Sequence, residues 1–201
     1  MTCFATGTTI DTPKGPQPIE RLEIGDLVST RDNGAMPIVW AGKRRVLGRG
    51  KYAPICIAAG ALGNSDLLRV SPEHRMLIEG PLVEVLFELP SVLVAAKHLV
   101  GLDGVSQENV GEITYHHLLF ASHQIIRGGG CWSESFFLSE AGLAGLDQMA
   151  AAEIHALFPD ILVAQGDFGP AIETVLKKHE ALLLKEQMSA TFERNAINRA
   201  S

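Results

Sequence analysis

The sequence predicts a mainly β domain over residues 1–137, followed by an α-helical extension over residues 138–201. Three observations support this fold class. Up to about residue 135, short runs typical of strands alternate with turns. An apolar period of the helical kind is almost absent from the same part of the chain. Near Ser139 the composition changes to an Ala- and Leu-rich sequence with helical spacing.

The expected strands follow one another along the chain with short connections. They are residues 8–11, 26–30, 36–43, 52–57, 68–70, 76–78, 83–87, 92–96, 114–120 and 123–127. Turns rich in Gly, Pro, Asn and Asp separate them at residues 13–16, 32–34, 79–81 and 103–104, where each residue type has a backbone reason to be present. Short helical turns are expected at residues 18–22 and 95–100. This regular alternation of short strands and turns indicates an all-β domain.

The extension has apolar residues at helical spacing in two places. The first helix is expected to end at Phe158-Pro159, and its apolar residues are Leu143, Leu146, Met149, Ile154 and Leu157. The second is expected to run from Gly169-Pro170 to about Met188, with proline near its first turn. Because their apolar stripes must be covered, the two helices either cap the β domain or bind a protein partner.

Length and charge exclude several classes of protein. A chain of 201 residues can bury one sizeable core. Its net charge of −6 provides no basic face for nucleic acid. No apolar run is long enough to span a bilayer, and the N-terminus lacks the pattern of a secretory signal, so the cytoplasm is the default location.

The cysteine pattern gives no reason to expect a disulfide framework, a metal site or a cofactor. Cys3, Cys56 and Cys131 cannot all pair, and none stands in a Cys-x-x-Cys motif. Cys56 lies in an apolar run and is expected to be a small buried residue. For Cys131, which follows three glycines, a core position is favoured over a place near a reactive site.

Cys3 is the candidate nucleophile because its thiol lies almost at the start of the sequence, directly after a peptide bond that it can attack. Attack on the carbonyl carbon of Thr2 would convert the Thr2-Cys3 amide into a thioester, provided that a nearby group protonates the leaving nitrogen. Ser71 and His74 offer a hydroxyl and an imidazole three residues apart, in a turn enforced by Pro72. Both side chains could converge on the same peptide bond.

Four ordered blocks of the sequence resemble the Hedgehog/intein (Hint) module of bacterial proteins, over residues 3–137. The blocks are Cys3-Phe4 with Gly7-Thr8-Thr9-Ile10; Pro18-Ile19-Glu20-Arg21-Leu22 with Gly25-Asp26-Leu27-Val28-Ser29-Thr30; Ser71-Pro72-Glu73-His74-Arg75; and Tyr115-His116-His117-Leu118-Leu119 with His123-Gln124-Ile125-Ile126 and Glu134-Ser135. Four blocks in order are far more specific than any one alone. The resemblance implies a horseshoe-like all-β fold with two halves related by a pseudo-two-fold axis, and an autocatalytic N-to-S acyl shift.

The resemblance also assigns catalytic roles. Cys3 would be the nucleophile and His74 the acid that protonates its nitrogen. Ser71, in place of the threonine more usual in the family, would supply a second hydrogen bond, and His123 a second imidazole at the C-terminal edge of the site. Without the resemblance, Ser71-Pro72 also fits an ordinary β-turn, and His74 a packed or solvated turn residue.

Another pair of histidines lies in the fourth block. His116 and His117 alternate across an expected strand, so at most one points inward, and their spacing to His123 matches no common metal pattern.

Two departures from the family pattern define the functional alternatives. The sequence Trp132-Ser133-Glu134-Ser135-Phe136 lacks the closing His-Asn pair of splicing inteins, which favours thioester cleavage without splicing. The peptide N-terminal to Cys3 would be the cis substrate, yet only Met1 and Thr2 precede it. Either this sequence belongs to a longer precursor, or it is a free-standing, inactive Hint scaffold that acts as a binding or structural module through its helical tail.

Overall fold

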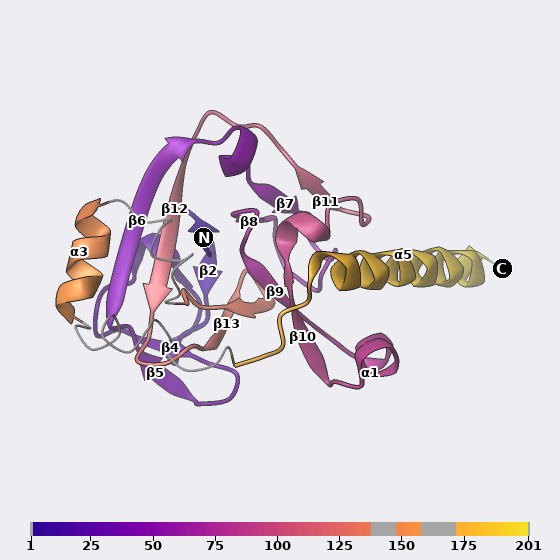
Figure 1. Cartoon of the computed structure of the whole chain (residues 1–201), viewed down its shortest axis with the longest axis horizontal. Coiled ribbons are helices and arrows are strands. Elements are labelled where there is room, and N and C mark those ends of the chain that lie inside the picture. The colour runs from indigo at the N-terminus through magenta and orange to yellow at the C-terminus, as the bar shows by residue number, and fades with distance from the viewer. Residues whose placement is uncertain (1, 138–147, 158–171, 201) are drawn as a thin grey trace.

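The chain folds into two six-stranded antiparallel sheets that contribute to one apolar core. The computed structural model describes residues 2–137, 148–157 and 172–200. All fourteen strands within these ranges lie in the first segment, and each pairing between them is antiparallel. The predicted mainly β fold is confirmed (Figure 1).

The first sheet brings the start of the chain between two segments that are far away in sequence. Its strand order is β11-β7-β8-β1-β12-β6. In that order the bounds are Val105–Gln107, Ile55–Ile57, Leu68–Val70, Phe4–Ala5, Glu112–Leu119 and Trp40–Leu47. Strand β1 is therefore interior, with β8 on one side and β12 on the other. The long pair of β6 and β12 closes one edge of the sheet (Figure 1).

The second sheet has the order β10-β9-β14-β13-β2-β3. In that order its bounds are Ser91–Ala95, Arg75–Glu79, Cys131–Glu134, Ile125–Gly128, Thr9–Ile10 and Gln17–Pro18. Strands β4 (Leu27–Ser29) and β5 (Ala35–Pro37) form a separate hairpin. One core cluster contains side chains from both sheets, among them Phe4 and Val70 from the first and Met76, Val92 and Ile126 from the second.

A two-glycine turn connects β13 to β14 and fixes their register. Gly129 and Gly130 have φ angles of 58° and 88°, the positive values that a type I′ hairpin turn needs at both central positions. Residues with a Cβ rarely adopt this conformation. The turn pairs Gly128 with Cys131 and, further along, Ile125 with Glu134, which places the Glu134 carboxylate next to the N-terminal residues.

Short helices fill the connections within the β domain. Two 3-10 turns, Ile19–Arg21 and Ala96–His98, occur where the sequence predicted helical turns, and a third spans Gly50–Tyr52. Residues 83–87, however, were wrongly predicted to form a strand, because they belong to helix α1 (Pro81–Phe87). Pro81 occupies the first turn, and the inward-packed residues Leu82, Val83, Leu86 and Phe87 follow helical rather than alternating spacing.

The extension supplies two further helices, α3 (Gln148–Leu157) and α5 (Lys178–Ala200). The first lies within the predicted helix; its apolar residues Leu143 and Leu146 and its expected end at Phe158-Pro159 lie outside the described residues. The second begins later and ends later than predicted. Residues 172–177 instead run beside β10, where Leu93 N–H donates to Thr174 O and Leu176 N–H donates to Leu93 O, at 2.8 and 2.9 Å. Pairing with an edge strand satisfies polar backbone groups that a helix would have left open on β10.

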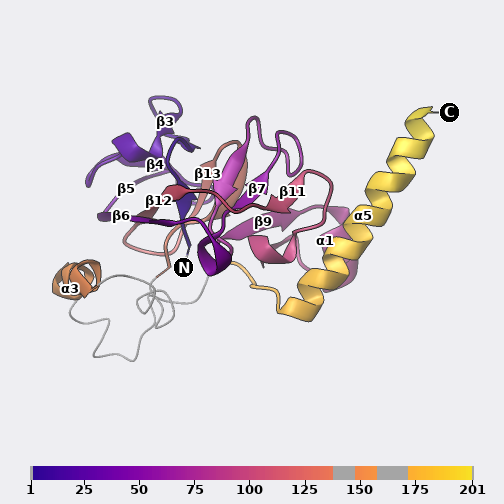
Figure 2. The same cartoon turned by 90° about the horizontal axis from the view of Figure 1, so that it is seen from above.

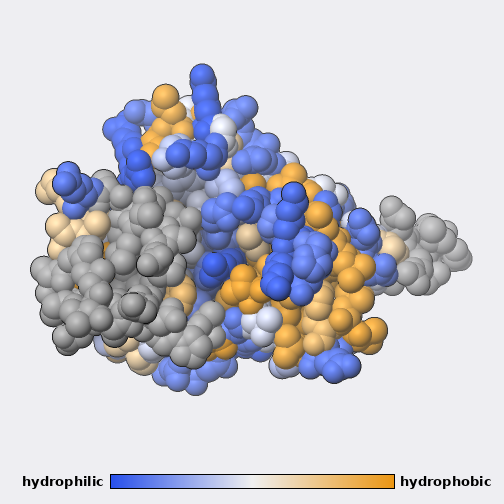
Figure 3. Space-filling model, in the orientation of Figure 1, coloured by the Kyte–Doolittle hydropathy of each residue, from blue (hydrophilic) through white to orange (hydrophobic). Residues whose placement is uncertain are grey.

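Helix α5 packs its first half against the β domain and extends away from it with its second half (Figures 1 and 2). Ala181 and Leu184 belong to the main core cluster, and Lys185 Nζ donates to Val100 O at 3.1 Å. Apolar side chains gather on the surface around α1 and the start of α5 (Figure 3), where Val85 is 80% exposed and Leu183 is also exposed. Within the described residues, no helix combines the length and the apolar character that crossing a membrane requires.

Candidate active site

The candidate site is built where β1 begins between β8 and β12. Phe4 is paired with Val70 of β8 and with His116 of β12, both in antiparallel register. One residue before Phe4, Cys3 therefore lies beside Ser71, which follows β8, and beside His117 of β12. The Cys3 side chain is only 1% exposed.

Ser71 is hydrogen-bonded to the amide that Cys3 would cleave. The Cys3 backbone N–H donates to Ser71 Oγ at 3.1 Å, and the Ser71 backbone N–H donates to Cys3 O at 3.0 Å. The turn after Ser71 is closed by the His74 N–H, which donates to Ser71 O at 3.0 Å. The hydroxyl oxygen is therefore held next to the nitrogen that would leave.

His117 contacts both partners of the attack that was proposed from the sequence. Its Nε2 lies 3.4 Å from Cys3 Sγ, and its Nδ1 lies 2.8 Å from Thr2 O. A carbonyl oxygen can only accept, so Nδ1 carries the proton and Nε2 is left to accept from the thiol. A single imidazole thus connects the nucleophile with the carbonyl it would attack.

His74 is completely buried, with 0% exposure, beside the first residues of the chain. Its ring packs edge-on against the Phe4 ring, with 4.3 Å between the centroids. Neither ring nitrogen has a hydrogen-bond partner among the described residues. A buried imidazole with both nitrogens unsatisfied is unusual in a folded protein and calls for an explanation beyond packing.

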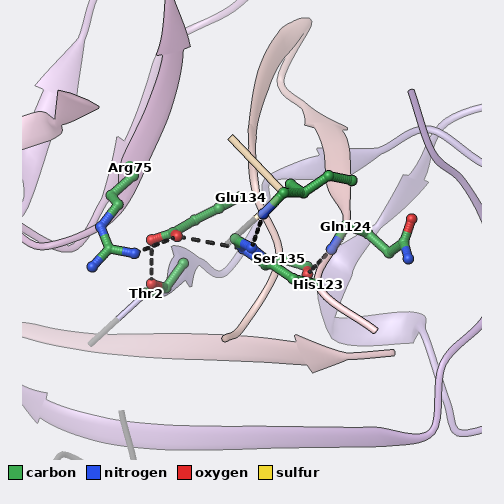
Figure 4. Close-up of polar contacts among 7 residues, drawn as sticks. Thr2, Arg75, His123, Gln124, Glu134 and Ser135 are labelled. Atoms are coloured by element: carbon green, nitrogen blue, oxygen red, sulfur yellow. Dashed lines mark hydrogen bonds and ion pairs between the residues drawn. The ribbon is translucent and has the colours of Figure 1, made fainter. Parts of the chain in front are cut away.

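His123, predicted as a second imidazole at the C-terminal edge of the site, belongs to a network around Glu134 (Figure 4). The Glu134 carboxylate accepts from Thr2 Oγ1 at 2.6 Å and from Arg75 at 3.0 Å, and His123 Nε2 lies 3.5 Å from it. On the other side of the ring, His123 Nδ1 accepts from the Ile172 N–H at 3.3 Å. His123 therefore connects to Thr2 through Glu134, while His117 occupies the position next to the sulfur.

Burial determines the charge state of most of these groups. It raises the pKa of the Cys3 thiol to about 12 and lowers those of His74 and His117 to about 3 and about 4. Burial alone would raise the pKa of Glu134, but His123, the Arg75 charge and the Thr2 hydrogen bond together hold it below its ordinary value. At neutral pH the site thus holds a protonated thiol, neutral His74 and His117 rings and one ionised carboxylate.

The two neutral histidines predict a loss of stability in mild acid. Their pKa values lie below 6.5 in the folded chain, so below about pH 6.5 the unfolded chain takes up protons that the folded chain does not. The free energy of unfolding should fall by about 1.4 kcal/mol per pH unit for each histidine, between about pH 6.5 and about pH 4. Urea unfolding across this range measures the slope.

A His74→Phe variant is the matched control for that experiment. It keeps a buried ring beside Phe4, and the unpaired ring nitrogens mean that no hydrogen bond is lost. The variant should lose the part of the slope that His74 contributes, about 1.4 kcal/mol per pH unit. A slope that stays unchanged would contradict the assignment of a neutral, buried His74.

Sequence reasoning overlooked three participants: His117, Glu134 and the side chain of Thr2. His117 and Glu134 lie within the fourth block, and the alternation of His116 and His117 already predicted that at most one of them points inward. In the structure His116 bonds to Thr6 Oγ1 at 2.8 Å, while His117 faces the thiol. Among the described residues, no three His, Cys, Asp or Glu side chains are grouped so as to hold a metal ion.

Comparison with known proteins places this geometry in a family context. The family model described as the Hint domain matches residues 2–140. A bacterial intein-like domain from Clostridium thermocellum is similar in structure, with 15% identity and a TM-score of 0.46, over 67% of this chain and 99% of that one. A splice-inactive variant of the AceL NrdHF class 3 split intein gives 15% identity and a TM-score of 0.46, over 67% of this chain and 97% of that one. The MchDnaB-1 intein with the N145AA change has 16% identity and a TM-score of 0.44, over 66% of this chain and 98% of that one. No curated protein sequence matches the chain.

Proposed function

This chain belongs to the Hint domain family, and we propose that it cleaves the peptide bond between Thr2 and Cys3 through an N-to-S acyl shift. The observation that carries the proposal is the double contact of His117, with Cys3 Sγ on one side and Thr2 O on the other. The cis substrate is the peptide that precedes Cys3.

In the first step, His117 Nε2 takes the proton of the thiol while Sγ attacks the carbonyl carbon of Thr2. A base is needed because the pKa of the buried thiol is about 12, so almost no thiolate exists at neutral pH. The Nδ1–H of the same ring already points at the carbonyl oxygen, and the positive charge gained by the ring strengthens this bond to the developing oxyanion. One residue thereby activates the nucleophile and stabilises the tetrahedral intermediate.

In the second step, the C–N bond breaks and the nitrogen of Cys3 takes up one proton. The thiol has lost one proton and the amine gains one, so the step is neutral overall. Burial leaves His74 without a stored proton, since its pKa is about 3. In this proposal the proton that His117 took from the thiol therefore passes through His74, which accepts it on one ring nitrogen and donates one from the other to the nitrogen of Cys3, so that His117 becomes neutral again. Ser71 Oγ, bound to the same nitrogen, orients it during the transfer.

In the third step, water or another nucleophile attacks the thioester and restores the Cys3 thiol. A pocket of about 320 Å³, lined in part by His116, His117 and Glu20, brings solvent to β12 beside the site. Residues 131–137 contain no asparagine that could cyclise. This favours cleavage over splicing.

The test is a fusion in which a reporter domain precedes Thr2. With hydroxylamine near neutral pH, the reporter should be released with a hydroxamate on the carbonyl of Thr2, which mass spectrometry identifies. A fusion that stays intact while the module gives a cooperative unfolding transition would overturn the proposal. It would favour the alternative, an inactive scaffold whose helical tail binds a protein.

The described part of the tail gives that alternative little support. Leu176, Ala181 and Leu184 are buried in the core of the chain itself rather than offered to a partner. Among the side chains of α1 and α5 whose burial is described, Val85 and Leu183 are large, apolar and exposed. We therefore place self-cleavage ahead of partner binding.

A further inference from the structure

The side chain of Thr2 is bound more specifically than cleavage of its peptide bond requires. Its hydroxyl donates to Glu134 Oε1 at 2.6 Å, a short bond of the kind formed with an ionised acceptor. Thr2 is the residue on the acyl side of the scissile bond. The contact is independent of those that hold the reacting atoms, which come from Ser71 and His117.

Glu134 is well placed to act as a fixed acceptor. It is 0% exposed at the end of β14, where pairing with Ile125 sets its position. Arg75 and His123 engage its other oxygen, Oε2, at 3.0 and 3.5 Å. Oε1 therefore points towards the Thr2 side chain, and a buried carboxylate oxygen accepts hydrogen bonds but cannot donate one.

We infer that Glu134 selects a hydroxyl-bearing residue, threonine or serine, immediately before Cys3. The inference rests on the proposed cleavage at this bond and names the class of peptide that the site accepts. Valine has nearly the shape of threonine but no donor, so it would leave Oε1 buried and unsatisfied. Aspartate would place a second negative charge beside the first.

The cost of a wrong residue should appear in the cleavage rate because the substrate is tethered. A weaker contact at residue 2 lowers the fraction of molecules whose scissile bond is seated against Cys3 and His117. Losing a hydrogen bond to a charged group should lower that fraction by about tenfold to hundredfold. Serine, which keeps the donor, should remain within about threefold of threonine.

The experiment compares reporter fusions with Thr, Ser, Val or Asp at position 2, under single-turnover conditions with hydroxylamine. We expect Thr and Ser to cleave at similar rates, Val to be about 10- to 100-fold slower, and Asp to be slower than Val. A Val variant that cleaves within about threefold of Thr would overturn the selection by Glu134.

A second measurement separates this inference from the cleavage itself. In the Cys3→Ala background, carboxyl NMR of Glu134 reports its pKa with Thr, Ser or Val at position 2. Val should raise the pKa relative to Thr, because the hydrogen bond that favours the charged carboxylate is lost, whereas Ser should leave it near the Thr value. If no fusion cleaves but this shift is present, recognition of the hydroxyl stands and the cleavage proposal fails. If the shift is absent, the recognition fails whether or not cleavage occurs.

Discussion

Cys3→Ala in the reporter fusion should abolish hydroxylamine-dependent release completely. The variant removes the atom that forms the thioester, and nothing else in the proposed mechanism attacks the carbonyl of Thr2. Release is followed by gel electrophoresis and by the mass of the freed reporter. The release that remains should be below the detection limit of the assay.

The matched control is Cys131→Ala. Cys131, the first residue of β14, is also a buried free thiol. Its Sγ donates to Leu62 O, and it takes no part in the proposed site. This variant should release the reporter at the rate of the parent chain. Cleavage at Thr2 that persists in Cys3→Ala would show that another group breaks the bond and would remove the basis of the mechanism.

His117→Ala should slow release by about 100- to 10,000-fold. The ring is proposed to act twice, as base towards the thiol and as donor to the oxyanion, and each role contributes on the order of two or more powers of ten when removed alone. The two contributions come from one residue and need not multiply. Single-turnover release measures the loss, and urea unfolding checks that the β domain remains folded.

His116→Ala is the control for that variant because it removes the adjacent imidazole on the same strand. His116 bonds to Thr6 Oγ1 instead of to the thiol, and shortening this pocket-lining side chain leaves the pocket open to the nucleophile. Its loss should therefore change the rate by less than about threefold. If His117→Ala and His116→Ala cleave equally fast, the thiol loses its proton to another group. His74 would then be the next imidazole to replace.

The sequence could predict the strands and the local turn at Ser71 because both depend on neighbouring residues. Turn residues and short apolar runs mark the strand boundaries, and Pro72 forces the turn that brings Ser71 and His74 together. Residues 83–87 could not be assigned in this way. A short apolar run fits a strand or a helix equally well, and the packing of α1 decides between them.

The rest of the site depends on strand register, which the sequence does not encode locally. His117 reaches Cys3 because β1 pairs with β12 at one particular offset, and Glu134 reaches Thr2 because the Gly129-Gly130 turn folds β14 back along β13. Shifting either pairing by one residue would turn the side chain to the opposite face. The resemblance to the Hint module placed His117 and Glu134 in the right block without showing which of its polar side chains meets the thiol.

The strand-like segment beside β10 has a practical consequence for protein production. A fragment that ends at Phe137 would leave the Leu93 N–H and C=O without the partners that Thr174 and Leu176 provide, on an edge strand whose side chains are buried. Bare edges of this kind pair readily with other copies and lead to aggregation. Expression of the module should therefore retain the chain through the first half of α5, where Leu184 completes the apolar contacts.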